Sequence, residues 1–473
     1  MQTSADRDLW EKEQDLLAHE RENRPESFVV SPAAKNDLQQ RVGITVLPEE
    51  LPSGYIRHSP LDFLIEEIGP SGQVSPVADG PEQAAAGDGQ GTVYADLVKV
   101  GLATPEAVRR VAESLGIGPE SIRFAGSKDA DAVSAQRISI RNSSLDKALS
   151  LDLPGILLNR CFTGKGAINV GDLNGHRFTV FVRTDGPVDK AWFQAKLAVL
   201  EKDGVVNYYG VQRFGPPRFL SHLFGMYLCQ GDLPNLVKVF LTQASPTEVP
   251  YAARLREAAA GRYGDWPAMK EAMSAMPYSF RYELAMLEAL ARYPEGRGFP
   301  AAVSAVAQQA DMWAKAYASY LANRLMSKAA RGIDEVPEEI PMMLSNEANA
   351  SKPYATYLRA DRATDYLEHL GKFRFIALGK AQRVPVRLRP KILASAILTD
   401  GAALSFELPK AAYAMTVLTH LFDVASGFPE PDWVSQEEVD LKVALGMGDL
   451  SGIRKRFATV LAELAQARKP EGE

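Results

Sequence analysis

Cysteine is scarce in this 473-residue sequence, and long apolar runs are missing altogether. The two cysteines, Cys161 and Cys229, form no CxxC pair and cannot build a disulfide framework, so we expect a reducing, cytoplasmic setting. No hydrophobic stretch approaches the length needed to cross a bilayer, which predicts no membrane segment. Residues 1–28 are too charged for a signal peptide.

Metal-binding and nucleotide-binding motifs are missing as well. None of the 6 histidines is paired with another histidine, a cysteine or an acid at the spacing of a zinc site. The sequence contains neither a phosphate-binding G-x-x-x-x-G-K-[ST] loop nor a G-x-S-x-G nucleophile turn. Any chemistry that the protein performs is therefore expected to need no metal, no nucleotide cofactor and no other cofactor.

Positive charge is not in excess, because the formal net charge at pH 7 is −6. Nucleic-acid-binding domains usually carry a basic excess, so this total argues mildly against such a partner. The local field matters more than the sum, however, and residues 380–391 form a short basic strip. A nucleic acid therefore stays open as a partner.

Composition changes along the chain and predicts its organisation. With 46% hydrophobic and 24% charged residues, a chain of this length is expected to fold into two or three domains. Residues 1–45 form a charged N-terminal extension, and residues 70–91, rich in Gly, Pro, Ala and Ser, form a flexible loop. Strand and helix patterns mix in residues 46–216 and 379–473, whereas residues 217–378 have helical periodicity. This predicts an α+β domain interrupted by a mainly helical one.

Local patterns place individual elements. Helical patterns occupy residues 104–117, 188–204 and 451–470. Strand patterns occupy residues 55–69, 176–183 and 403–422. Thr104 precedes Pro-Glu and is the expected N-cap of the first helix. In the second strand, Phe178 shares one face with Val180 and Val182.

An acid directly follows a base in "FAGSKDADAVSAQRISI", residues 124–140. Asp129 lies between a small-residue turn and a predicted strand, where an Asx turn or a helix cap beside a solvated Lys128 would explain it. Alternatively, the turn aims the carboxylate into a cleft and Lys128 keeps it ionised. An ionised carboxylate can act as a nucleophile or as a general base. Asp131 is the rival acid.

The segment "NYYGVQRFGPPR", residues 207–218, mixes aromatic rings with hydrogen-bond donors. Gln212, Arg213 and Arg218 supply the donors. Aromatic side chains interleaved with arginine suit RNA, in which bases stack and phosphates bind guanidinium groups. A strand followed by a turn, with its aromatics in the core, explains the same composition equally well.

Six segments, in order, resemble the motifs of one family. "IRHSPLDFLIEEI", "FAGSKDADAVSAQRISI", "GDLNGHRFTVFVR", "NYYGVQRFG", "RFLSH" and "FELPKAAYAMTVL" are similar to D-F-x-V-x-E, G-x-K-D-x-x-A-x-T-x-Q, G-x-L-x-G-N-x-F, N-Y-F-G-x-Q-R-F-G, R-x-x-T-H and F-x-L-P-K-G-S-Y-A-T-x-L. These motifs belong to the TruD family of pseudouridine synthases. The resemblance covers residues 55–425, and the six motifs together are highly specific.

The resemblance implies an enzyme that isomerises uridine to pseudouridine in RNA without a cofactor. It implies a mixed-sheet catalytic domain split by a helical insertion, and a tRNA substrate, typically modified at position 13. Asp129 matches the catalytic aspartate and Phe178 the aromatic residue that contacts the target base, while His176 stands where the family usually has Asn. Further matches, expected to bind or shape the substrate site, are Lys128, Gln136, Asn207, Gln212 and Arg213.

Two other functions remain open from the sequence. Departures from the motifs at His176, Ala411 and Met415 would suit a former enzyme that still binds or remodels tRNA. A sugar-directed hydrolase would need two carboxyl groups across the scissile bond, and Asp129 has only Asp131 as a visible partner. A monomer is the favoured oligomeric state.

Overall fold

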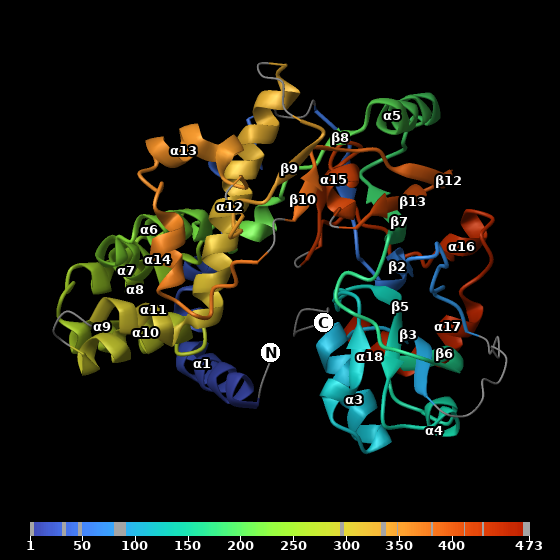
Figure 1. Ribbon diagram of the computed structural model, residues 1–473, viewed down its shortest axis with the longest axis horizontal. Coiled ribbons are helices and arrows are strands. Elements are labelled where there is room, and N and C mark those ends of the chain that lie inside the picture. Colours follow the sequence, from blue (N-terminus) through green and yellow to red (C-terminus); the bar gives the residue numbers. More distant parts are fainter. Residues whose placement is uncertain are drawn as a thin grey trace. The chain divides into compact units, whose positions relative to one another are not determined.

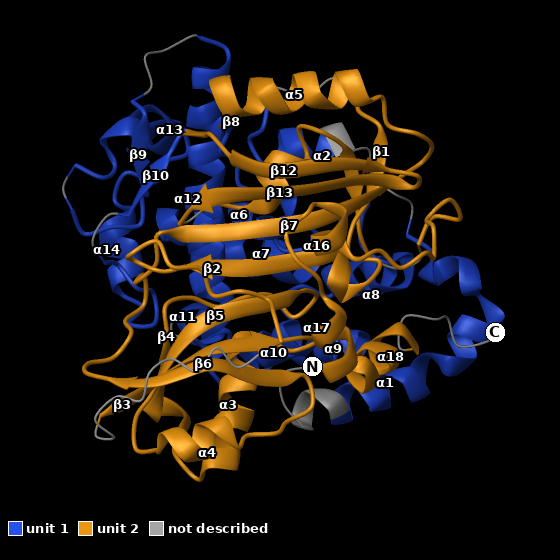
Figure 2. Ribbon diagram, turned by 90° about the vertical axis from the view of Figure 1, so that its right-hand side faces the viewer, with its two compact units in different colours: residues 1–47, 206–386 blue, residues 48–205, 387–473 orange. Residues whose placement is uncertain are grey.

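The structure, a computed structural model, describes most of the chain. The described residues are 4–30, 35–45, 50–79, 91–293, 298–332, 337–347, 349–379, 382–410, 412–427 and 430–466. They form two compact units (Figure 2). We call residues 48–205 and 387–473 the sheet unit, and residues 1–47 and 206–386 the helical unit.

A 10-stranded sheet forms the centre of the sheet unit (Figure 1). Its strands are β1 (Ser53–Tyr55), β2 (Phe63–Ile68), β3 (Thr92–Lys99), β4 (Ile122–Phe124), β5 (Val133–Ile140), β6 (Ile156–Gly164), β7 (Gly175–Thr184), β12 (Lys391–Leu398), β13 (Gly401–Pro409) and β14 (Asp423–Ala425). The main order is β12-β13-β7-β2-β5-β3-β6, with β1 paired to β7 and β14, and β4 paired to β5. The β2–β5 and β1–β14 pairs are parallel and the others antiparallel, so the sheet is mixed.

Helices cover both faces of this sheet. They are α3 (Thr104–Leu115), α4 (Leu145–Leu149), α5 (Lys190–Asp203), α15 (Ala414–Leu418), α16 (Leu441–Ala444), α17 (Ser451–Arg456) and α18 (Ala458–Gln466). In β2, Phe63 and Ile65 pack with α5 and α15, whereas Leu64 packs with the α17 region on the other face. The alternation expected from the sequence thus divides β2 between two apolar cores.

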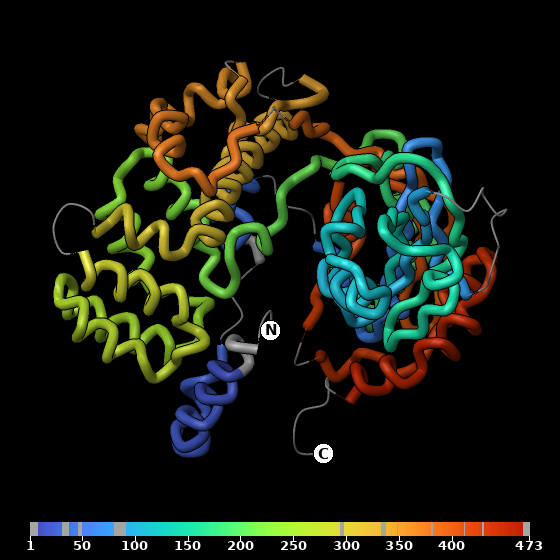
Figure 3. The backbone as a smooth tube through the Cα atoms, turned by 60° about the horizontal axis from the view of Figure 1, so that its bottom comes forward, coloured from blue at the N-terminus to red at the C-terminus, as the bar shows by residue number. Residues whose placement is uncertain are grey.

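The helical unit follows the chain through two stretches (Figure 3). Its helices are α1 (Ser4–Asn23), α2 (Lys35–Arg41), α6 (Ser221–Gln230), α7 (Leu233–Thr242), α8 (Pro250–Ala260), α9 (Trp266–Met273), α10 (Arg281–Arg292), α11 (Gly298–Ala305), α12 (Ala307–Ala330), α13 (Ala355–Ala360) and α14 (Tyr366–Gly371). The unit also contains two short strands that pair with each other, β9 (Glu339–Pro341) and β10 (Arg383–Pro385). A second short pair, β8 (Val205–Val206) and β11 (Arg387–Leu388), lies where the chain passes between the two units. A Cβ on Gly225 would lie 2.0 Å from the carbonyl oxygen of Trp313, so only glycine allows α6 and α12 to approach so closely.

The N-terminal residues pack as part of the helical unit. Leu17 of α1 is buried, and the carboxylate of Glu13 accepts hydrogen bonds from the backbone N–H groups of Tyr278 and Ser279, each 2.8 Å long. These N–H groups lie in the turn just ahead of α10. The charged α1 therefore fixes the turn that leads into another helix.

The α+β class expected from the sequence is confirmed, and three local expectations are corrected. Residues 403–422 are not one strand: β13 ends at Pro409 and α15 follows, because Ala414, Val417 and Leu418 share one buried helical face. The final helix breaks at Phe457 into α17 and α18. Thr104 begins α3 but does not cap it. Of the loop expected at 70–91, residues 80–90 lie outside the described residues, as do residues 467–470 of the final helix.

Candidate active site

The turn that carries Asp129 is tied to the rest of the sheet unit by its backbone. The hydroxyl group of Thr104 accepts a hydrogen bond from the N–H of Lys128 (2.9 Å) and donates one to the amide oxygen of Gln136 (2.8 Å). The amide nitrogen of Gln136 in turn donates to the carbonyl oxygen of Gly126 (2.9 Å). Because the hydroxyl of Thr104 is hydrogen-bonded to this turn, it does not cap α3.

A buried lysine fixes the turn at Asp129 itself. The Nζ of Lys99 donates to the carbonyl oxygens of Asp129 (2.7 Å) and Leu102 (2.6 Å). Burial lowers the pKa of Lys99 to about 7, although the Asp129 carboxylate partly opposes this shift. A neutral amine still has two hydrogens to donate, so these two contacts suit either protonation state.

The Asp129 carboxylate faces solvent and has one charged partner in the described structure. Its side chain is 66% exposed, and Oδ2 lies 3.1 Å from Nη2 of Arg57. The Arg57 guanidinium lies over the ring of Phe63, with Cζ 4.5 Å from the ring centroid. A cation over an aromatic face is attracted to it, so the ring helps to fix the group that holds Asp129.

Lys128 does not hold Asp129 ionised, contrary to the expectation from the sequence. Its Nζ lies 2.7 Å from Oε2 of Glu67 in β2, and the two side chains are 4% and 2% exposed. It also donates to the carbonyl oxygen of Gly126 (3.1 Å). Neighbouring residues in an extended turn point to opposite sides, which is why Lys128 enters the interior while Asp129 faces outward.

Aromatic rings line the sheet beside this carboxylate. Phe178 of β7 is 7% exposed and lies opposite Ile65 of β2 and Phe406 of β13. Its ring centroid is 6.3 Å from that of Phe63 and 5.6 Å from that of Phe406. The ring contacts therefore run from Phe178 through Phe63 to the guanidinium of Arg57 and its partner Asp129.

His176 lies two residues before Phe178 on β7, opposite Glu67 of β2. Burial, with a further contribution from the positive charge of Lys128, lowers the pKa of His176 to about 3. The ring is therefore neutral at pH 7. Its Nε2 is buried and has no hydrogen-bond partner in the described structure. Its ring centroid is 5.9 Å from that of Phe178.

The motif that contains His176 also reaches the Asp129 turn. The N–H of Gly171 donates to the carbonyl oxygen of Ala125, 2.8 Å away, and φ of Gly171 is +89°. This backbone angle favours glycine. The second glycine of the motif, Gly175, starts β7, where an added Cβ would lie 2.1 Å from the carbonyl oxygen of Leu408.

The other three expected site residues belong to the helical unit. Asn207 is buried, and its Nδ2 donates to the carbonyl oxygen of Pro385 (2.9 Å), so its contacts are with the backbone. Gln212 and Arg213 are exposed. Arg218 is buried against the Glu283 carboxylate and backbone carbonyls, which removes it as a surface donor. Of the three aromatics in this segment, Tyr209 and Phe214 are core residues, and Tyr208 is partly buried against the same core.

Sequence reasoning missed the residues that orient the site. These are Arg57, Glu67, Lys99 and Thr104. Arg57 and Glu67 lie inside the segment "IRHSPLDFLIEEI", so the charged residues of that motif were an available signal. Lys99 carried the weaker signal of a lysine at the end of an apolar strand.

Among the described residues, no group of three or more His, Cys, Asp or Glu side chains could hold a metal ion. In the same part of the chain, no helix is both long and apolar enough to cross a membrane.

The sheet unit is thus an α+β domain that presents a braced carboxylate beside a row of aromatic rings. Residues 45–379 match the model of the family described as tRNA pseudouridine synthase D (TruD). The chain belongs to this family, as the sequence motifs suggested.

Relatives support this assignment. The tRNA pseudouridine synthase D of Geotalea daltonii is 28% identical over 77% of this chain and 95% of its own length. A protein of Methanopyrus kandleri, named a probable tRNA pseudouridine synthase D, is 32% identical over 67% of this chain and 82% of its own. A crystal structure from Methanosarcina mazei, described as a TruD protein, has a TM-score of 0.61 at 21% identity and covers 82% of this chain and 98% of that one. This last likeness supports the fold.

Proposed function

We propose that this protein isomerises a uridine of tRNA to pseudouridine and that Asp129 is the reacting carboxylate. Membership of the TruD family and the names of the relatives support the activity and the substrate class. The observation that carries the residue assignment is the Arg57–Asp129 pair, because it holds an accessible carboxylate beside aromatic rings. The proposal extends to uridine 13 of tRNA, to action in the cytoplasm and to a monomeric enzyme.

The reaction rearranges one nucleotide and needs no other reactant. The N1–C1′ bond breaks, the uracil turns, and a C5–C1′ bond forms; C5 loses its hydrogen and N1 gains one. Asp129 either attacks C1′ and is later displaced, or removes the C2′ proton to form a glycal and returns it. Either role needs an ionised carboxylate, and Oδ2 of Asp129 lies 3.1 Å from the guanidinium of Arg57.

The target uracil must leave its stack before its sugar can react, which costs a few kcal/mol. Stacking on an aromatic side chain returns about 1–3 kcal/mol per base. We assign this role to Phe178. His176 is the proposed hydrogen-bond partner of the base, because a neutral imidazole has one donor and one acceptor nitrogen. In the helical unit, the exposed Gln212 and Arg213 are the proposed RNA contacts.

Asp129→Asn tests the central assignment, with Asp131→Asn as a matched control. Asp131 is an exposed acid two residues away and makes no ion pair in the described structure. Unmodified tRNA transcripts and their position-13 variants serve as substrates, and pseudouridine is mapped after single-turnover incubation. We expect Asp129→Asn to abolish the product while the dissociation constant for tRNA stays within a few-fold, and Asp131→Asn to retain activity. Turnover by Asp129→Asn near that of the wild type would refute the assignment; binding by an inactive wild-type protein would indicate a tRNA-binding homologue instead.

A further inference from the structure

We infer that Glu430 is a positioning residue for the active site: its carboxylate clamps the residues on either side of Arg57 and so fixes the guanidinium that holds Asp129. This inference rests on the proposed function, in which Asp129 is the reacting group. Glu430 belongs to none of the six motif segments and comes from the C-terminal part of the sheet unit.

Arg57 has a backbone conformation that its surroundings must maintain. Its φ is +63°, in the left-handed region that side chains other than glycine rarely adopt. Such a residue keeps this conformation only where neighbouring contacts determine it, and these conformations concentrate at functional sites. Arg57 follows β1 by two residues and lies at the turn toward β2, and in this conformation its guanidinium reaches Asp129.

Glu430 supplies contacts on both sides of this residue. The hydroxyl of Tyr55 donates to Oε1 of Glu430 (3.2 Å) and to the carbonyl oxygen of Gly427 (2.8 Å). The Nδ1 of His58 lies 2.9 Å from Oε2. One carboxylate therefore joins the residues two before and one after Arg57. The His58 and Glu430 side chains are 17% and 13% exposed, so little water competes with this pair.

Strand pairing brings the C-terminal segment to this position. β1 pairs in parallel with β14, so that Tyr55 lies opposite Ala425. The next residue continues the contact: the N–H of Ile56, a buried core residue, donates to the carbonyl oxygen of Ala425 (3.1 Å). Glu430 is thus held five residues beyond a fixed strand.

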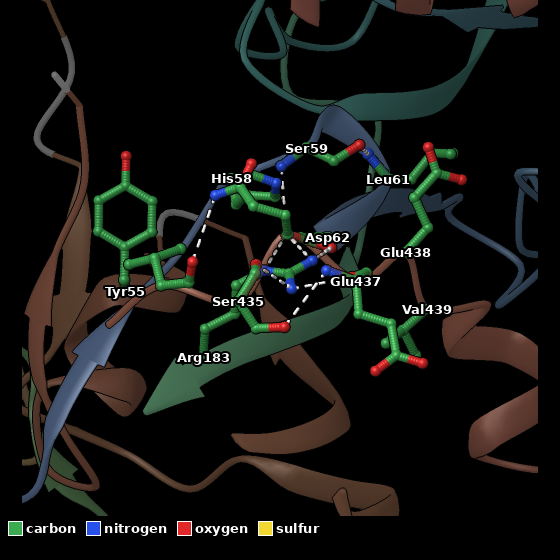
Figure 4. A network of polar contacts seen from close by, with 12 residues as sticks. Tyr55, His58, Ser59, Leu61, Asp62, Arg183, Ser435, Glu437, Glu438 and Val439 are labelled. Atoms are coloured by element: carbon green, nitrogen blue, oxygen red, sulfur yellow. Dashed lines mark hydrogen bonds and ion pairs between the residues drawn. The ribbon is translucent and has the colours of Figure 1, made fainter. Parts of the chain in front are cut away.

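A second set of contacts anchors the chain beyond the clamp. Figure 4 shows Asp62 and Arg183 facing one another, with Ser59 and Ser435 beside them. The N–H of Ser59 donates to Oδ2 of Asp62 (3.1 Å), and the buried Arg183 pairs with the same carboxylate. Arg183 also donates to the carbonyl oxygens of Ser435 (2.8 Å) and Glu437 (2.9 Å).

The contacts of Arg183 and the pairing with β1 make it possible to distinguish two roles for the Glu430 side chain. The segment that follows it is held by Arg183, and the segment before it by β1, without any help from the Glu430 side chain. If Glu430 merely held the C-terminal segment in place, its loss would lower stability and nothing else. If it acts through Arg57, its loss frees the residues around Arg57 and lowers the rate of the chemical step.

The test compares Glu430→Ala, Glu430→Gln and the control Glu437→Ala in single-turnover pseudouridine formation on tRNA. Glu437 carries the same charge on the same segment, but its side chain is exposed and its carbonyl contact survives the substitution. A misplacement of about 1 Å can cost about 100-fold in rate, so we expect Glu430→Ala to be about 10- to 100-fold slower, with tRNA affinity within about twofold. Glu430→Gln keeps an acceptor for Tyr55 and should recover most of the rate, and Glu437→Ala should equal the wild type.

A double-mutant cycle tests whether Glu430 acts on the reaction through Arg57. If Glu430 acts through Arg57, the combined Arg57→Ala, Glu430→Ala protein should be no slower than Arg57→Ala alone, because coupled residues are not additive. Three outcomes would each overturn the inference. The fold-reductions in rate of the two single variants could multiply in the double variant, Glu430→Ala could be as fast as Glu437→Ala, or Glu430→Gln could be as slow as Glu430→Ala. If Glu430→Ala does not fold, Tyr55→Phe removes a single hydroxyl and should slow the reaction in the same direction.

The clamp and the proposed function can fail separately. A wild-type protein that forms no pseudouridine on any tRNA contradicts the function. Crystal structures of the wild type and Glu430→Ala then show whether Glu430 positions Arg57. We expect Arg57 Nη2 and Asp129 Oδ2, 3.1 Å apart in the wild type, to separate beyond hydrogen-bonding distance in the variant. An ion pair that remains in place would overturn it.

Discussion

Arg57, which precedes Asp129 by 72 residues, is the residue whose side chain pairs with it, while the adjacent Lys128 pairs with Glu67. The two cations next to the proposed catalytic acid therefore have different tasks. Arg57 acts on the carboxylate at the surface, and Lys128 anchors the turn from inside the sheet unit.

Arg57→Ala should lower the single-turnover rate of pseudouridine formation about 10- to 100-fold, because Asp129 loses the side chain that orients it. Arg57→Lys should recover part of this loss, since an ammonium group restores charge but not the planar guanidinium. Single-turnover rates at saturating tRNA, with the dissociation constant measured separately, check the cause: the rate should fall while tRNA affinity stays within a few-fold. A rate equal to that of the wild type would mean that the Arg57–Asp129 pair plays no part in the reaction.

Lys128→Met should destabilise the protein by about 3–5 kcal/mol, because it leaves the buried Glu67 carboxylate without its partner. Combining it with Glu67→Gln should restore much of the loss: the glutamine is neutral and can still accept the hydrogen bond that Glu67 receives from the N–H of Arg137. Urea unfolding of the sheet unit within the full chain measures both. If Lys128→Met were fully stable yet inactive, Lys128 would act on the substrate rather than on the turn.

The sequence allowed the framework to be predicted because periodicity reports local burial. The alternation in residues 176–183 predicted β7, and Phe178, Val180 and Val182 do share one core. The same logic failed at residues 403–422, where only Pro409 and Lys410 break the run between the apolar residues of β13 and those of α15. A short apolar run does not distinguish the two periods.

The contacts within the site could not be predicted in this way. Glu67 and Lys128 are 61 residues apart, and Lys99 reaches Asp129 from a separate strand. Such partners depend on strand order and register, which the pattern of one strand does not contain. Motif matching identified Asp129, Phe178 and His176 as candidates, whereas the reasoning from sequence adjacency paired Lys128 with Asp129 instead of Glu67.

Phe178→Leu should slow the reaction about 10- to 100-fold, because stacking of a base on the ring contributes about 1–3 kcal/mol. The structure makes a control necessary: Phe178 is a core residue as well, so its replacement also lowers stability. Phe406→Leu alters a fully buried ring 5.6 Å away and should cost similar stability without loss of stacking. Equal rates for the two variants would assign Phe178 to the core alone.

His176→Asn should make the protein less sensitive to acid. The pKa of His176 is lowered to about 3 in the folded protein, against about 6.5 when unfolded. Between these values the unfolded chain binds a proton that the folded protein does not, so the free energy of unfolding falls as pH falls below about 6.5. The contribution is about 1.4 kcal/mol per pH unit, or at most about 2 kcal/mol at pH 5.

Urea unfolding at pH 7 and pH 5 checks this prediction. The wild type should lose about 2 kcal/mol more than His176→Asn over that interval. The buried His222, whose pKa is lowered to about 4, is present in both proteins and cancels in the comparison. At pH 7 the variant should form pseudouridine at least as fast as the wild type, because it restores the Asn of the motif that this segment resembles, and an amide also offers a donor and an acceptor. Equal acid sensitivity would mean that His176 is already charged in the folded protein; a collapse in rate would mean that the neutral ring has a role that an amide cannot fill.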